Sequence, residues 1–263
     1  MQNNSMQNNS IYKLEKIISS GSFGCVYLGS CGNKKYAIKK DNSDLLKNEI
    51  KIYKHLRSVK NIPIIYDYIQ KDNIKYIVME LMNIDLIKYK DIIFNTDLHI
   101  DKCLDLFIHL INIISVIHDY GIVHRDLKPK NICFNNYYEP YIIDFGLAKP
   151  IIHNNKHIEE KTINAIIGSN NFSSINVINL IEPSRRDDVE SIMYIFLYVL
   201  LDSENYLYYS NMDTIYKKDI DVISSLVYNY SEYDSKKIEN VLKYIRKLKF
   251  NQRPNYSYII SLM

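Results

Sequence analysis

Two short runs near the middle of the chain contain the residue types best suited to chemistry. His124–Asn131 reads HRDLKPKN, and Asp144–Gly146 reads DFG. Asp126 could accept the proton of an attacking hydroxyl group, and Lys128 could contact a phosphate group during its transfer. Phosphoryl transfer uses such groups because it depends on positioning and charge neutralisation more than on covalent catalysis.

Both runs also supply side-chain oxygen atoms of the kind that bind magnesium. Asn131 follows Asp126 by five residues and could reach a magnesium ion, while Asp144 could hold magnesium that bridges phosphate groups. The alternative is a polar loop that follows a helix by chance, and two such runs in this order argue against it. The sequence therefore predicts ATP and Mg²⁺ as cofactors, with Asn131 and Asp144 as the metal ligands.

A glycine-containing turn lies upstream, between two strand-like segments. Gly21–Gly24 reads GSFG, and the missing side chains at its ends would let backbone N–H groups approach phosphate oxygens. Hairpin turns also use glycine freely, so this run is weak evidence by itself. The pattern G-x-G-x-x-G would begin with glycine where this chain has serine. The residues predicted to bind ATP here are Ser19, Gly21, Ser22, Phe23 and Gly24.

A lysine and a glutamate complete the candidate catalytic set. Lys39 ends an A-I-K run and would pair with the α- and β-phosphates, and Glu49 would orient it through an ion pair. Either residue alone would be read as a surface charge, but their order along the chain with the other motifs favours a site. The predicted catalytic residues are Lys39, Glu49, Asp126, Lys128, Asn131 and Asp144.

An adenine pocket follows from the same register of motifs. Its roof, floor, gatekeeper and hinge would come from apolar residues that could equally form plain core. The residues predicted to line it are Val26 and Ala37 (roof), Cys133 and Ile143 (floor), Met79 (gatekeeper), and Glu80–Met82, with Glu80 and Met82 as hinge contacts.

The spacing of apolar side chains predicts the elements that must position these residues. Residues 11–40 and 62–81 show strand-like patterns, whereas residues 43–57 repeat apolar side chains at helical spacing. From residue 101 the pattern is mainly helical, and the predicted helices are Leu104–His118, 186–201, 236–248 and a short one after Pro254.

These elements predict an α+β fold with two lobes that form one catalytic domain, 11–263. A small β-rich lobe would cover 11–82, and a larger helical lobe would cover 83–263. Residues 1–10 repeat the pentad MQNNS, and such a polar stretch predicts a disordered tail.

Composition and charge exclude several other classes of protein. The hydrophobic fraction of 47% and the charged fraction of 24% fit an ordinary globular protein. The net charge of +3, without a basic stripe, argues against a nucleic-acid binder. Residues 1–10 are too polar for a signal peptide, and Ile192–Leu201 is too short to span a bilayer. We expect a monomer that acts on protein substrates, without nucleic-acid or membrane partners.

The spacing of the cysteines bears on the cellular compartment in which the protein is expected. Their spacing contains no C-x-x-C pair and no zinc-ligand pattern, so a reducing compartment is favoured over a disulfide framework. We therefore expect the chain in the cytosol or the nucleus, or in the host cytoplasm if it is viral.

The motifs extend from residue 16 to 256 and resemble those of the protein kinase superfamily. Within it, the chain resembles the casein kinase one family, as a divergent and minimal member. The stretches that carry this narrower resemblance are Gly21–Gly29 (GSFGCVYLG), Tyr141–Lys149 (YIIDFGLAK), Ser173–Asn176 (SSIN), Ser184–Ser191 (SRRDDVES) and Asn255–Tyr258 (NYSY).

The resemblance implies a bilobal protein-kinase fold and a serine/threonine kinase that transfers the γ-phosphate of ATP to protein hydroxyls. Lysine at position 128 is the serine/threonine-type pattern. The resemblance also implies that Asp188 anchors the catalytic loop and that the activation loop is ordered without a phosphate.

Two departures from the family pattern bear on substrate choice. Asn171 stands where the family has an arginine that helps to bind phosphorylated substrates, and Glu204–Tyr209 reads ENYLYY in place of an L-P-W segment. Lys161, Arg185 and Arg186 could supply charge, but the acidic residues that follow the two arginines favour internal ion pairs instead.

Two alternative functions stay open from sequence. A pseudokinase scaffold would have lost Lys39, Asp126 or Asp144, and none is lost. A small-molecule kinase usually lacks the D-F-G run and the S-I-N and R-R-D-D stretches, which this chain has.

Overall fold

The computed structural model describes residues 11–21, 24–41, 43–71 and 74–263. Contacts divide the chain into two compact units, the first formed by the described parts of Met1–Ile84 with Cys133–Gly146, and the second by Asp85–Ile132 with Leu147–Met263. The predicted tail and two predicted ATP-binding residues, Ser22 and Phe23, lie outside the described residues. The predicted lobe boundary after residue 82 stays a prediction.

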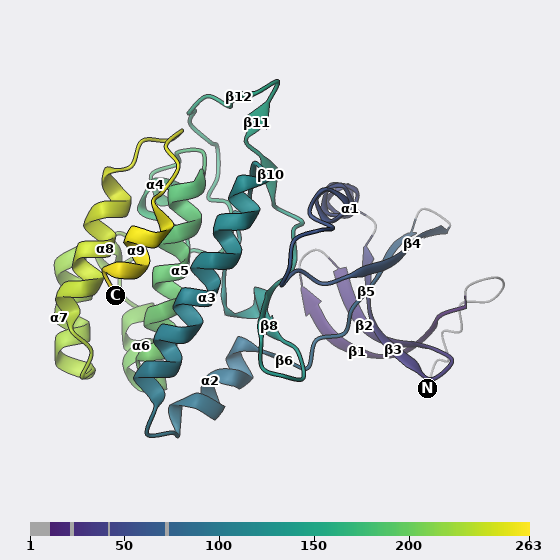
Figure 1. Ribbon diagram of the computed structural model, residues 1–263, viewed down its shortest axis with the longest axis horizontal. Coiled ribbons are helices and arrows are strands. Elements are labelled where there is room, and N and C mark those ends of the chain that lie inside the picture. Colours follow the sequence, from purple (N-terminus) through teal and green to yellow (C-terminus); the bar gives the residue numbers. More distant parts are fainter. Residues whose placement is uncertain (1–10, 22–23, 42, 72–73) are drawn as a thin grey trace. The chain divides into compact units, whose positions relative to one another are not determined.

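The first unit is built on a five-stranded antiparallel sheet in the order β1-β2-β3-β5-β4 (Figure 1). Strand β2 needs glycine at its first position, 24, where φ is +126° and a Cβ would lie 2.2 Å from the backbone oxygen of Lys40. The strands are β1 (Lys13–Gly21), β2 (Gly24–Cys31), β3 (Lys34–Asp41), β4 (Ile65–Lys71) and β5 (Ile74–Met79).

Helix α1 (Leu45–His55) covers one face of this sheet and confirms the helix predicted within 43–57. Leu46 and Ile50 pack with Ala37, Ile77 and Met79 in one buried cluster, because residues four apart share a helix face. Glu49 adjoins this apolar face and is only 1% exposed. The helix therefore holds a carboxylate against the sheet instead of presenting it to solvent.

Three short strands lie mostly in the first unit, although Asp85 and Ile132 are assigned to the second. They form a sheet in the order β6-β8-β9, and the amide N–H of Asn83 donates to the backbone oxygen of Phe134 at 2.8 Å. The strands are β6 (Ile84–Asp85), β8 (Ile132–Phe134) and β9 (Pro140–Ile142).

The second unit is mainly helical, which confirms the α-rich half of the predicted α+β class. Helices α3 and α5 run side by side, α8 packs against α5, and α7 packs against α8 (Figure 1). Every residue of α5 except Tyr198 is buried, so α5 is the core of this unit. The helices are α2 (Leu86–Phe94), α3 (His99–Asp119), α4 (Ile175–Ile178), α5 (Arg185–Leu200), α6 (Ser203–Ser210), α7 (Ile220–Tyr230), α8 (Ser235–Lys247) and α9 (Tyr256–Ser261).

The remaining elements are short and surround the segments that carry the motifs. They are β7 (Ile122–Val123), paired with β10 (Lys149–Pro150), β11 (Ile152–His153), paired with β12 (Lys156–His157), and two 3-10 turns, η1 (Pro129–Asn131) and η2 (Tyr216–Lys218). Within the described part of the chain, no helix combines the length and apolar character that a membrane crossing requires.

Candidate active site

Lys39 is the centre of an ion-pair cluster in the first unit. It lies on β3, in the middle of the sheet, and its Nζ is 2.8 Å from Oε2 of Glu49 and 2.7 Å from Oδ1 of Asp144. The structure thus brings together three predicted site residues that are far apart in sequence. One cation between two carboxylates leaves a net negative charge for a further cation.

Burial and charge act on this cluster in opposite directions. Burial alone would lower the pKa of Lys39, but the charges of Glu49 and Asp144 outweigh it and raise that pKa, so the ammonium group stays charged. Burial also raises the pKa of the Glu49 carboxyl above its usual range, against the attraction of Lys39. The lysine charge is therefore what keeps a carboxylate stable at this buried position.

A second cluster, in the second unit, is centred on Asp126. Lys128 donates from Nζ to Oδ2 of Asp126 at 2.6 Å, and Asn131 donates from Nδ2 to the backbone oxygen and Oδ2 of Asp126 at 2.8 and 3.1 Å. The other carboxylate oxygen, Oδ1, is buried and has no hydrogen-bond partner among the described residues. That atom is a free acceptor of the kind that a general base needs.

Asp188 of helix α5 holds the catalytic loop, His124–Asn131, as the family resemblance implied. Its carboxylate accepts from the backbone N–H groups of His124 at 2.7 Å and Arg125 at 2.9 Å. Arg125 has φ of +68°, a left-handed conformation that is uncommon for a residue with a side chain. The two hydrogen bonds hold this conformation directly before Asp126.

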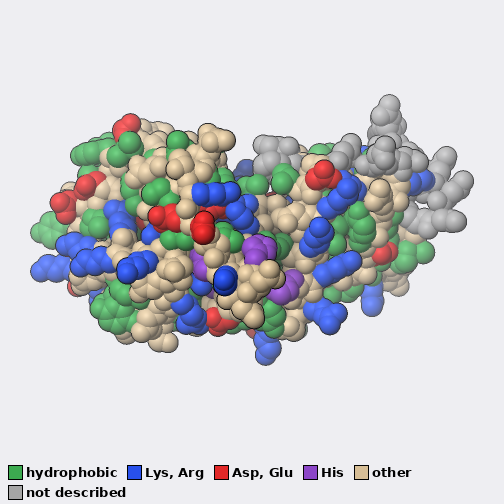
Figure 2. All heavy atoms as spheres, turned by 90° about the horizontal axis from the view of Figure 1, so that it is seen from above, with side chains coloured by type: hydrophobic (Ala, Val, Ile, Leu, Met, Phe, Trp, Pro, Cys, Tyr) green, Lys and Arg blue, Asp and Glu red, His purple; other side chains and the backbone are tan. Residues whose placement is uncertain are grey.

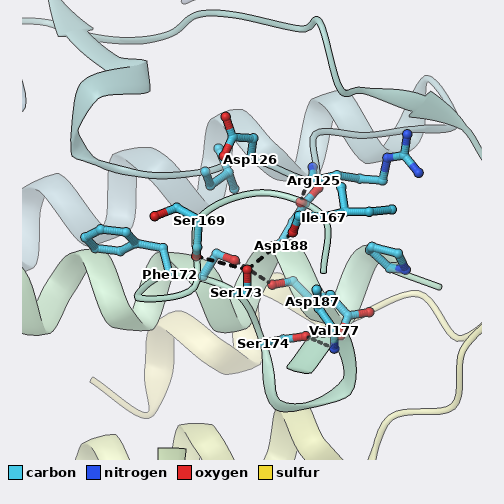
Figure 3. Close-up of a pocket in the computed structure, with 13 residues that line it drawn as sticks. Arg125, Asp126, Ile167, Ser169, Phe172, Ser173, Ser174, Val177, Asp187 and Asp188 are labelled. Carbon is cyan, nitrogen blue, oxygen red and sulfur yellow. Dashed lines mark hydrogen bonds between the residues drawn. The ribbon is translucent and has the colours of Figure 1, made fainter. Parts of the chain in front are cut away.

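A small pocket lies beside Asp126 and is lined by the segment that precedes helix α5 (Figure 3). Gly168 lies between two residues that line the pocket, Ile167 and Ser169, with φ of +85°, and a Cβ there would lie 2.6 Å from the backbone oxygen of Arg125. Ser173 donates to the backbone oxygen of Ser169 at 2.9 Å, which fixes the turn that faces the catalytic loop. Only glycine allows this close approach of the two segments.

The residues predicted for the adenine pocket all lie in the first unit. Val26, Ala37 and Met79 belong to one packed cluster, and Ala37 is paired with Met79 across β3 and β5. Cys133 is buried on β8, and Ile143 follows β9. Packing in a cluster is also what plain core residues do, so the adenine pocket stays a prediction.

The other predicted residues of this unit lie at strand and sheet edges. Ser19 pairs with Val26, and Gly21 pairs with Gly24, across β1 and β2. Glu80 and Met82 follow β5, and the N–H of Glu80 donates to the backbone oxygen of Ile64 at 2.9 Å.

The donor atoms present fit ATP and magnesium. Both hydrogen bonds from the Asn131 side chain use its amide nitrogen, which orients the amide oxygen as the atom available to a cation. Asn131 in the second unit and Asp144 in the first stay the predicted metal ligands, and Lys39 stays the predicted contact to phosphate oxygens.

The sequence predicted internal ion pairs for the two arginines at the start of α5, and this is correct for only one of them. Arg186 lies 3.8 Å from Asp187 but makes its closest ion pair, at 2.8 Å, with Glu160. Arg185 forms no ion pair among the described residues, and its Nε and one terminal nitrogen are buried without a hydrogen bond. Asp188 is committed to the catalytic loop instead, so it does not pair with either arginine.

The sequence also missed a carboxylate that holds three cations. The buried side chain of Glu182 lies 3.2 Å from Arg125, 2.8 Å from Lys149 and 3.9 Å from Lys161. Because Glu182 is 57 residues from Arg125, no local pattern could have revealed the pair.

Two lysines near Asn171 were missed in the same way. Lys217 donates to the side-chain oxygen of Asn171 at 2.6 Å, and Lys218 donates to its backbone oxygen at 2.7 Å. Both lysines are buried, at 2% and 0% exposure. Burial lowers the pKa of both lysines, and that of Lys218 well below its usual value. The position without an arginine is therefore surrounded by two amino groups that are already used in internal hydrogen bonds.

Figure 2 shows several groups of lysine and arginine side chains on the face drawn, together with acidic and histidine side chains near its middle.

Comparison with known proteins points in the same direction as the site. The sequence matches the protein kinase domain family over residues 12–261. It is also similar to a probable casein kinase I homolog of Encephalitozoon cuniculi, with 29% identity over 270 residues, which cover 96% of this chain and 83% of that protein.

Proposed function

Since this chain belongs to the protein kinase domain family, we propose that it is a serine/threonine kinase of the casein kinase I type, which transfers the γ-phosphate of ATP to protein hydroxyls. The Lys39 ion pairs with Glu49 and Asp144 carry this proposal, because they hold a buried lysine between one buried and one partly exposed carboxylate, as phosphate and metal binding in a kinase require. The resemblance to a casein kinase I homolog supports the choice of serine and threonine.

In this proposal each residue has one task. Lys39 orients the phosphates and is itself oriented by Glu49. Oδ1 of Asp126 accepts the proton of the attacking hydroxyl, while Lys128, held 2.6 Å from Oδ2, neutralises charge on the transferring group. ATP with magnesium, when bound, supplies the phosphoryl group and charge neutralisation.

A transfer assay tests this function. Purified protein is incubated with labelled ATP, magnesium and an array of serine, threonine and tyrosine peptides. Phosphoserine and phosphothreonine are the expected products. Dominant phosphotyrosine would contradict the residue choice, and ATP binding without any transfer would favour a scaffold.

We expect the enzyme to be active without phosphorylation of its activation loop, because Glu182 already neutralises Arg125, the residue before Asp126. In many kinases that arginine pairs with a phosphate on the activation loop, but here Arg125 donates to a buried carboxylate. Phosphatase-treated enzyme should keep its full rate, and Glu182→Gln should lower kcat about tenfold, since hydrogen bonds between charged groups are the stronger ones. Initial rates measure both effects.

One outcome of the phosphatase experiment would contradict this expectation. Inactive phosphatase-treated enzyme, restored by phosphorylation at Thr162 or Ser169, would show that Glu182 does not replace a phosphate. Glu159→Gln is the matched control, because Glu159 is exposed and should leave the rate unchanged.

Little preference for phosphorylated substrates is expected. The two buried lysines at Asn171 already donate to it, so an incoming phosphate would have to compete with internal hydrogen bonds. The ratio of kcat/KM for a peptide with phosphoserine three residues upstream to that for the serine peptide should stay below about tenfold, or 1.4 kcal/mol. A larger ratio would show a working anion site, and Asn171→Arg should increase the ratio.

A further inference from the structure

A chain of buried hydrogen bonds connects the C-terminal helix α9 with the catalytic loop. The hydroxyl of Tyr256 lies 2.6 Å from Nδ1 of His118, and Nε2 of His118 lies 2.8 Å from Oδ2 of Asp188. The same carboxylate accepts from the N–H groups of His124 and Arg125. Tyr256, His118 and Asp188 are 5%, 4% and 2% exposed, so water does not compete for these bonds.

The chemistry of the groups gives each bond one direction. Burial alone would raise the pKa of Asp188, but the hydrogen bonds from His118 and the backbone hold it below its usual value, so Asp188 is a carboxylate that can only accept. His118 therefore donates from Nε2. Burial lowers the pKa of His118, which keeps the ring neutral and makes Nδ1 an acceptor. Tyr256 must then donate its hydroxyl proton to Nδ1, which fixes the tautomer that serves Asp188.

The position of Tyr256 is itself fixed from two sides. Asn255 caps α9 by accepting from the N–H of Tyr258 at 3.0 Å. The guanidinium group of Arg253 lies 4.9 Å from the centre of the Tyr256 ring and binds both carboxylate oxygens of Asp119, at 2.8 and 3.0 Å. Because Asp119 follows His118 in α3, the same contacts that hold α9 also hold the tyrosine beside its histidine.

We propose that Tyr256 is a positioning residue for phosphoryl transfer, acting through His118 and Asp188 on the backbone that carries Asp126. The inference rests on the proposed function, and none of the sequence motifs assigned a task to this tyrosine. A general base must lie within hydrogen-bond reach of the hydroxyl that it deprotonates, so a small shift of the loop lowers the rate of transfer. Binding of ATP depends on other residues and should be affected less.

The first test compares two tyrosines of one helix. Tyr256→Phe removes the hydroxyl from the chain of hydrogen bonds and should lower kcat about tenfold, with KM for ATP changed less than about twofold. Tyr258→Phe is the matched control, because that tyrosine is 45% exposed and its ring packs against Tyr244. An unchanged kcat in Tyr256→Phe, or equal losses in both variants, would overturn the proposal.

A double-mutant cycle separates positioning from general loss of packing. His118→Gln keeps an amide that can donate to Asp188 but removes the ring acceptor used by Tyr256. If the two residues act as one unit, the loss of kcat in the double variant is smaller than the product of the single losses. Independent, multiplicative losses would contradict a connection through His118.

Amide hydrogen exchange tests the connection without any assay of activity. In Tyr256→Phe the N–H groups of His124 and Arg125 should exchange faster than in Tyr258→Phe, because the carboxylate that holds them has lost its fixed partner. Thermal unfolding confirms that both variants are folded. If the wild type shows no transfer, the proposed function fails while the exchange rates still decide the structural connection, and unchanged exchange overturns it.

Discussion

Asp126→Asn is expected to reduce kcat by about 10²- to 10⁴-fold, the range typical for loss of a general base. The amide keeps the size and shape of the carboxylate, and Asn131 and Lys128 remain next to it. What is lost is the buried oxygen without a partner, Oδ1, which is the atom able to accept the proton of the attacking hydroxyl. Single-turnover rates with a serine peptide measure the effect.

Binding of ATP should survive this change, because the Lys39 cluster is untouched. Titration calorimetry with ATP and magnesium checks this, and Asp105→Asn is a control because Asp105 is an exposed aspartate on α3. A rate within about threefold of wild type would show that Asp126 is not the base. An inactive wild type that still binds ATP would favour the scaffold interpretation.

Lys39→Met is expected to have the second largest effect, on both activity and stability. Loss of one charge-stabilising donor typically costs on the order of 10²- to 10³-fold in rate. The variant also leaves Glu49, whose side chain is 1% exposed, without its cation. Breaking a buried ion pair on one side costs about 3–5 kcal/mol of unfolding free energy, so the variant should be strongly destabilised at neutral pH.

The stability of this variant should depend on pH in a defined direction. Burial already raises the pKa of Glu49, and removal of Lys39 raises it further. For a carboxyl group whose folded pKa lies above its unfolded value of about 4.3, stability is full below the unfolded pKa and falls as pH rises through the folded pKa. Urea unfolding at pH 5 and pH 8 should therefore show Lys39→Met to be far less stable at pH 8.

Adding Glu49→Gln supplies the control for that measurement. The double variant has no buried carboxyl group to ionise at position 49, so most of the pH dependence should disappear. An equal dependence on pH in the single and double variants would mean that another group, and not Glu49, carries the effect.

Local patterns predicted those parts of the fold that one segment determines by itself. Helix α1 was visible from Leu46, Ile50 and Tyr53, and the helix at 236–248 from its apolar face. Helix α7 was missed although the signals existed, since Asp219 caps it and Ile223, Leu226 and Val227 are spaced as on one buried face. Helix α6 had a weaker signal, because only Tyr209 on it is buried.

The residues of the site also divide into those that a local motif predicts and those that depend on contacts distant in sequence. The motifs around Asp126 and Asp144 were readable because phosphoryl transfer requires fixed residue types at short spacing. Contacts over long separations left no such trace, as Glu182 with Arg125 and Lys217 with Asn171 show. Arg185 was misjudged although Asp188 lies three positions further along α5, because the Asp188 carboxylate already accepts from His118 and from two backbone N–H groups of the catalytic loop.

The discontinuous make-up of the first unit has a consequence for synthesis of the chain. Cys133–Gly146 belongs to this unit, together with the residues up to Ile84. During translation the five-stranded sheet can form early, but Lys39 and Glu49 must wait for Asp144, which emerges several seconds later at about 5–20 residues per second. Until then Lys39 can form an ion pair only with Glu49, and the unit is complete only after residue 146 has left the ribosome. A fragment that stops at residue 84 would lack Cys133–Gly146 and therefore the ion pair between Lys39 and Asp144.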